Sequence, residues 1–226
     1  MRPTLHRTLL PMIAIAMGGI GCLSKTALVP QSYSIDPPAK RSAPSSGGIV
    51  LSLSRVEVVP PYSGQPFIYR TGEHVLVRDP YARFASPPGW LLTAAIEGYL
   101  VNADFVRDVV SPGHRIRSEA TVEVTVSEMA GELGPSGSSS VLTLRFRVFS
   151  NPGGAHQAVE ILLKTYSSTL PVSSTTAREI VGGWNRGLSD IMVEFQTDLR
   201  ASLVASRLLP SDPETVTGSG RHSASE

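Results

Sequence analysis

Apolar and polar residues alternate along much of the chain between residues 49 and 163, a pattern typical of β-strands with one buried face. In Val122–Val126 and Leu142–Val148 every second side chain is apolar. Shorter patterns predict further strands at residues 49–59, 66–70, 74–78, 105–110 and 159–163. The predicted connections between strands are rich in Pro, Gly, Ser and Asn: Pro60-Pro61, Thr71-Gly72, residues 131–140 and residues 151–154.

Two segments have helical features. The first begins at Pro87-Pro88-Gly89 and continues through an apolar run to Leu100. The second begins after Thr176, which forms a capping-box sequence with Glu179 three residues later. Its apolar residues recur every three or four positions as far as Leu203, which predicts one buried stripe.

Three glycines interrupt the second helix near its start. Gly182, Gly183 and Gly187 each weaken a helix by about 1 kcal/mol relative to Ala. We expect them to allow a close approach between the helix and the sheet. The order of strands, helix, strands and long helix predicts an α+β fold. This fold is a mixed, largely antiparallel sheet with two main helices packed on it, in a single domain.

The N-terminus has the three parts of a secretory signal peptide. Arg2 and Arg7 precede a short apolar run, Leu9–Ile20, which small residues follow. The run is shorter than the roughly 20 apolar residues that span a bilayer. It ends at Gly-Ile-Gly-Cys, so that Cys22, the only cysteine of the chain, lies directly after the predicted signal.

The Cys22 sequence resembles the lipobox of bacterial lipoproteins, with Gly19 where Leu is usual. The resemblance implies that the Cys22 thiol is diacylated, that the chain is cut before it, and that the new N-terminus is acylated. The residue after Cys22 is Leu23 instead of the Asp that often retains lipoproteins in the inner membrane. The resemblance therefore implies an anchor in the outer membrane, with the domain in the periplasm. A buried or unpaired thiol behind an ordinary signal is the alternative.

These features divide the chain into four parts. We predict a signal peptide at 1–21, a lipidated N-terminus and linker at 22–48, a folded domain at 49–205, and a disordered tail at 206–226. The linker and the tail are rich in Pro, Ser and Gly and have few residues to bury.

Composition and charge exclude several function classes. The chain is 41% hydrophobic and 17% charged, as in an ordinary globular protein. Its net charge of +1 gives no basic field that would attract nucleic acid, and we predict no nucleic-acid partner. With Cys22 acylated, no thiol is left for a disulfide or a thiolate metal site.

The sequence contains no catalytic constellation, and we predict a protein that is not an enzyme and has no cofactor. His74, His114 and His156 are isolated from one another and from any thiol, so we predict no metal site. Ser52 and Ser54 lack the Gly-x-Ser-x-Gly sequence of hydrolases.

Four residues are candidates for a partner interface. Arg145 and Arg147 are predicted on the polar face of one strand, where an acidic partner or lipid headgroup would meet them, although an ordinary polar sheet face is the commoner case. Trp184 lies on the apolar stripe of the long helix, which favours a core position, and an interface role is the alternative. Trp90 lies at the start of the first helix.

The order of several short motifs resembles a family, the auxiliary lipoproteins of ABC-type transport systems that work with MCE-domain proteins. The motifs follow the lipobox cysteine in this order: Tyr33-Ser34-Ile35, Val59-Pro60-Pro61, Pro66–Arg70 and Phe84–Leu92. In relatives a Trp stands near the start of the proline-led helix, a role that falls here to Phe84 or Trp90. The resemblance covers residues 22 to about 205.

The resemblance implies a non-enzymatic outer-membrane lipoprotein that docks a periplasmic MCE assembly and helps lipids cross between membranes. Its implied partners are an MCE-domain protein and ABC transporter subunits, and a homo-oligomer is also implied. The alternative is a structural or assembly lipoprotein of the envelope without a transport partner. A permease, an ATPase and an MCE protein encoded beside it would favour the first function.

Overall fold

The structure is a computed structural model that describes residues 29–36, 48–135, 137–151 and 157–210. The predicted signal peptide, Cys22 and the tail beyond residue 210 lie outside the described residues. The elements in chain order are β1 (Gln31–Tyr33), β2 (Ile49–Leu53), β3 (Glu57–Val58), β4 (Pro66–Gly72), β5 (Val75–Phe84), α1 (Pro88–Val101), β6 (Val106–Val110), β7 (Ala120–Gly134), β8 (Gly137–Ser150), β9 (Val159–Val172) and α2 (Ala177–Ala205).

The nine strands of the described residues all belong to one sheet, built around the long strand β7. On one edge of β7, strands β8 and β9 continue as an antiparallel meander. On the other edge, β2, β3 and β4 pair with successive parts of β7 in parallel. Strands β6, β5 and β1 extend the sheet from β2 and β4. The predicted α+β fold, with a mixed sheet and two helices, is confirmed.

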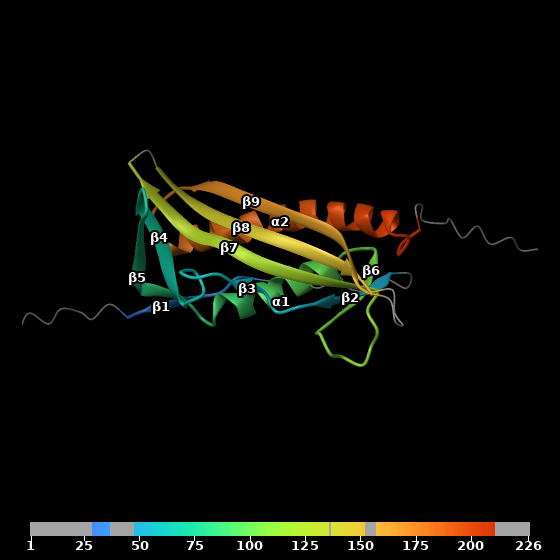
Figure 1. The fold of residues 1–226 in the computed structure, drawn as a ribbon. Helices are drawn as coiled ribbons and strands as arrows, with labels where there is room; N and C mark the ends of the chain where they lie inside the picture. The colour runs from blue at the N-terminus through green and yellow to red at the C-terminus, as the bar shows by residue number, and fades with distance from the viewer. Residues whose placement is uncertain (1–28, 37–47, 136, 152–156, 211–226) are drawn as a thin grey trace, which may run out of the picture.

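The sheet has one covered face and one open face. Along β8, Leu144, Phe146 and Val148 are buried, whereas Arg145 and Arg147 between them are exposed. Helix α2 lies behind β8 and β9 along the length of the molecule, and α1 lies beside it (Figure 1). A hydrogen bond of 2.8 Å from Gln196 Nε2 to the Tyr99 carbonyl joins the two helices.

Aromatic side chains fill the core between α2 and the sheet. Trp184 is 1% exposed and lies edge-on to Phe67, with 5.1 Å between the ring centroids. Its Nε1 donates to the carbonyls of Ala130 and Val141 at 3.2 and 3.1 Å. Eleven residues after Trp184 on the same helix face, Phe195 stacks on Phe146 of β8. The helix begins where the sequence predicts, and the Thr176 side chain accepts from the Glu179 N–H.

Several element boundaries differ from the predicted ones. The β4–β5 turn is at Glu73-His74 instead of Thr71-Gly72, and His74 has a φ of 61°. The predicted loop 131–140 is instead strand on both sides of a tight turn, with Gly134 opposite Gly137. This segment is rich in Gly and Ser and lacks the apolar alternation that predicts a strand. It still forms strands because backbone pairing needs no apolar side chain.

The folded domain also includes residues outside the predicted 49–205 block. Tyr33 and its neighbours in β1 pair with the end of β5, and Ile35 is 2% exposed. After α2, Leu208 and Leu209 pack against the core. Residues on both sides of the predicted block thus contribute to the core of the domain.

The expected close approach of α2 to the sheet occurs at Gly183 and Gly187. A Cβ at Gly183 would lie 2.6 Å from the Cβ of Ser140, and one at Gly187 would lie 3.1 Å from the Cβ of Ser168. At Gly182 a Cβ would meet only the Arg186 guanidinium at 3.5 Å. The contact between helix and sheet therefore depends on two of the three glycines.

We predict opposite effects for alanine at neighbouring glycines. Gly183→Ala is expected to lower the free energy of unfolding by about 1–3 kcal/mol, because the added methyl forces the helix away from Ser140. Gly182→Ala is the matched control and is expected to stabilise the helix by up to about 1 kcal/mol. Urea denaturation measures both variants. Adding Ser140→Gly to Gly183→Ala is expected to recover part of the loss, and equal effects of the two alanines would contradict the prediction.

Candidate interaction site

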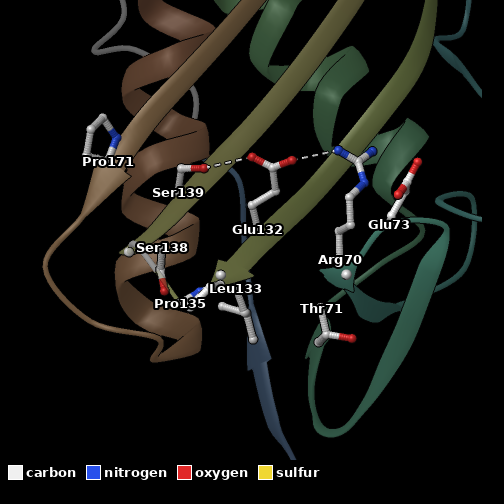
Figure 2. A pocket seen from close by; sticks show the side chains of 12 residues that line it. Arg70, Thr71, Glu73, Glu132, Leu133, Pro135, Ser138, Ser139 and Pro171 are labelled. Atoms are coloured by element: carbon white, nitrogen blue, oxygen red, sulfur yellow. Dashed lines mark hydrogen bonds and ion pairs between the residues drawn. The ribbon is translucent and has the colours of Figure 1, made fainter.

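An open pocket of about 520 Å³ lies where two hairpins meet at one end of the sheet. The end of β4, the turn between β7 and β8, and Pro171 of β9 line it (Figure 2). Its polar groups come from Arg70, Glu73, Glu132 and Ser139, which are far apart in the sequence. The pairing of β4 with β7 brings them together, since Arg70 is opposite Glu132.

Arg70 is neutralised by two carboxylates at the wall of this pocket. Its guanidinium donates to Glu132 at 2.7 Å and also forms an ion pair with Glu128. Burial lowers the pKa of Arg70, but the hydrogen bonds to Glu132 and Glu128 outweigh it and raise the pKa above its usual value. Ser139 Oγ donates to the other Glu132 oxygen at 3.2 Å. The cluster has more negative than positive groups and joins β4, β7 and β8.

Asp79 lies within β5, next to the pocket strand β4, and its carboxylate bonds to groups of β5 and β4. One carboxylate oxygen accepts from the backbone N–H groups of Tyr81 and Ala82 at 2.7 and 2.9 Å. The other accepts from the Tyr69 hydroxyl at 2.9 Å. Burial, followed by the hydrogen bond to Asp79, raises the pKa of Tyr69 well above its usual range. These bonds lie where the pairing of β5 with β4 is irregular, between Arg78, the partner of Ile68, and Arg83, the partner of Pro66.

A second polar cluster fastens α2 to β9. Lys164 Nζ lies 2.7 Å from carboxylate oxygens of both Glu194 and Asp198, and the Tyr166 hydroxyl donates to Asp198 at 2.7 Å. The hydrogen bonds from Lys164 and Tyr166 lower the pKa of Asp198. Each member of this cluster has a structural partner, so we assign it to stability.

The predicted interface residues do not form one site. Trp90 is 54% exposed at the start of α1, with the Arg55 guanidinium 3.8 Å from its ring centroid. Arg145 and Arg147 lie on the open face of the sheet, opposite the face that the helices cover, and Arg147 Nε is 2.9 Å from Glu160. Trp184 is 1% exposed and its ring fills the core beneath α2, so the possible interface role does not hold and the core position that the stripe favours does.

No sequence pattern indicates the residues that line this pocket. Arg70 is separated from Glu128 and Glu132 by 58 and 62 positions, and no local motif links them. Among the described residues no group of three His, Cys, Asp or Glu side chains is placed to hold a metal ion. In the same part of the chain, no helix combines the length and the apolar character needed to cross a membrane.

The family of ABC-type transport auxiliary lipoprotein components matches residues 33–194. This match runs from Tyr33, the last residue of β1, through most of α2, and it covers more than half of the sequence. The chain belongs to this family. The ABC-type transport auxiliary lipoproteins are not a class of enzymes. No functionally curated protein matches the sequence.

Solved structures share the fold of this auxiliary lipoprotein. A Xanthomonas campestris protein of the family DUF330 is 13% identical, with a TM-score of 0.62, and the match covers 80% of this chain and 98% of that one. An uncharacterised protein is 16% identical, with a TM-score of 0.59, over 76% of this chain and 99% of that one. At these identities the likeness shows the fold alone.

Proposed function

We propose that this protein is a lipid-anchored docking component of an ABC transport system that works with MCE-domain proteins in phospholipid traffic. In this proposal Cys22 holds it to the periplasmic face of the outer membrane, and the α+β domain binds the periplasmic assembly. The observation that carries the proposal is the match of residues 33–194 to the auxiliary lipoprotein family. The protein acts by binding and needs no catalytic group.

The sequence before the domain supports the anchor. Cys22 follows a short apolar run and three small or apolar residues, and it is the only thiol in the chain. Each buried methylene of an acyl chain contributes about 0.8 kcal/mol, and a single chain binds only marginally. Three chains on Cys22 would hold the protein on the membrane for practical purposes permanently.

Two exposed surfaces are suited to a docking role. The open face of the sheet carries Arg145 and Arg147, and the start of α1 carries Trp90 with Arg55 over its ring. Exposed Trp and Arg side chains are enriched where proteins bind one another strongly. The two surfaces lie on opposite sides of the sheet and can be tested separately.

The test is a purification of the full-length protein from its native envelope in mild detergent, with mass spectrometry of its partners. MCE-domain and ABC subunits are the expected partners, together with a triacylated N-terminal Cys22 peptide. An acylated Cys22 without transport partners would leave the alternative, a structural or assembly lipoprotein of the envelope. A free Cys22 thiol would contradict the anchor.

Variants in the same purification locate the docking surface. Trp90→Ala tests the start of α1, and the pair Arg145→Ala and Arg147→Ala tests the open sheet face. Val193→Ala is the matched control, because Val193 is 65% exposed and belongs to α2, not to α1 or to the open face of the sheet. Loss of the transport subunits with one test variant only would assign that surface.

A further inference from the structure

We propose that the exposed apolar edge of β5 rests against the lipid surface and orients the domain on the membrane. This β5 apolar edge consists of Val75, Leu76, Val77 and Tyr81. The inference rests on the proposed acylation of Cys22 and adds a second, non-covalent membrane contact. It concerns a different part of the molecule from the two docking surfaces.

Four apolar or aromatic side chains of the β5 apolar edge are exposed. Val75, Leu76 and Val77 are 50%, 42% and 45% exposed, and Tyr81 is 49% exposed. Three consecutive apolar residues of a strand point to both sides of the sheet, so neither side of β5 is covered here. Val75 and Val77 point to one side and Leu76 to the other, so their apolar surface surrounds the outer edge of the strand. Several exposed apolar residues gathered in one place mark a contact with a protein or a membrane more often than a single exposed residue does.

The register of the sheet places the first described residues of the domain beside β5. β1 is parallel to β5, with Gln31 opposite Ala82 and Tyr33 opposite Phe84. Going backward from Gln31, the described residues Pro30 and Val29 therefore lead away from Phe84, toward the Tyr81 side of this pairing. Val29, the first described residue, is 79% exposed. Figure 1 shows β1, β4 and β5 together at one end of the molecule.

The length of the tether excludes the opposite orientation. Val29 is seven positions after Cys22, and a chain of this length reaches at most roughly 25 Å when extended. Tyr69 of β4 is opposite Gly131 near one end of β7, whereas Leu51 of β2 is opposite Ala120 at the other end. Gly131 and Ala120 are eleven residues apart on β7, a distance of about 35 Å along the strand. If the Ala120 end faced the membrane, Val29 would lie about 35 Å from the membrane surface. The chain between Cys22 and Val29 reaches only roughly 25 Å, so the anchored domain cannot take this orientation.

The groups around the edge suit the headgroup layer of a membrane. Between Val75 and Tyr81, β5 has β4 on one side and no described strand on the other, since β1 pairs only with residues 82–84. Such a backbone edge needs water or headgroup partners, which the interface supplies and the hydrocarbon core does not. Arg78 is exposed beside the edge and is positively charged, as lipid phosphates require. Tyr81 has the apolar ring and polar hydroxyl that are favoured at membrane interfaces.

The test uses the chemistry of the single cysteine. In the lipidated full-length protein the Cys22 thiol is consumed, so that Leu76→Cys introduces the only free thiol. This thiol is labelled with an environment-sensitive fluorophore, and the protein is reconstituted into vesicles of phosphatidylethanolamine and phosphatidylglycerol that contain spin-labelled lipid. Val159→Cys is the matched control. Val159 is an exposed apolar strand residue (58%) opposite Ser150, at the far end of the sheet.

We expect severalfold stronger quenching by the spin-labelled lipid at position 76 than at position 159. Equal quenching at the two positions, or none at position 76, would overturn the inference. A blue shift at position 76 without quenching would mean that a protein segment covers the edge, and it would also overturn the inference. The protein without an introduced cysteine separates the two proposals: uptake of label would show a free Cys22 and contradict the anchor itself.

Discussion

Replacing Cys22 by Ser is expected to move the protein from the membrane fraction to the soluble periplasmic fraction and to leave the domain folded. The anchor depends on acyl chains on one sulfur atom, and a hydroxyl cannot take their place in the lipobox reaction. Among the described residues the core begins at Tyr33, eleven positions after Cys22, and we expect the domain to fold without the cysteine. Fractionation of cells and thermal unfolding of the released protein measure both halves of the prediction.

The variant needs an export route that does not depend on Cys22. Residues 1–21 are therefore replaced by an ordinary cleavable signal in the Cys22→Ser chain. Ser24→Ala with the native signal is the control and is expected to stay in the membrane fraction. Retention of the serine variant on the membrane would contradict the covalent anchor, and its unfolding would contradict the domain boundary.

The secondary structure could be predicted wherever apolar residues recur at one regular spacing, every second residue in a strand or every three or four in a helix. The apolar stripe of α2 and the alternation of apolar and polar residues in β7 and β8 each arise because one face of the element is buried. The pairing of strands could not be predicted in the same way. β7 has β2, β3 and β4 beside successive parts of one edge, and nothing in the local pattern of Val122–Val126 specifies these neighbours.

The candidate surfaces were harder to predict because exposure depends on long-range packing. Val75, Leu76 and Val77 have the composition of a buried strand, yet the structure leaves them without a cover. In α1 apolar residues occur all around the helix, so periodicity alone does not say which side faces the sheet. Trp90 proves exposed, and Leu92 two positions later is completely buried. The pocket around Arg70 exists only because two distant strands pair.

Trp184→Ala is expected to lower the free energy of unfolding by about 3–5 kcal/mol, the range for removing a large buried aromatic side chain. The ring is 1% exposed and contacts Phe67 and Phe84, with centroid distances of 5.1 and 5.5 Å. Its removal leaves a cavity between α2 and the sheet, and it also removes the N–H that bonds to two strand carbonyls. A loss of this size is a large part of the total stability of a single domain.

The matched control for this prediction is the other tryptophan. Trp90→Ala removes the same side chain from a position that is 54% exposed, and it removes the contact with Arg55. Its expected cost is about 0.5–1 kcal/mol, the value of a cation–π contact at an exposed site. Urea denaturation of both variants in the Cys22→Ser background compares them without the membrane. Trp184→Phe is expected to lie between them, because a smaller ring keeps most of the apolar contacts and loses the N–H. Equal losses for the two alanine variants would mean that α2 does not pack on the sheet through Trp184.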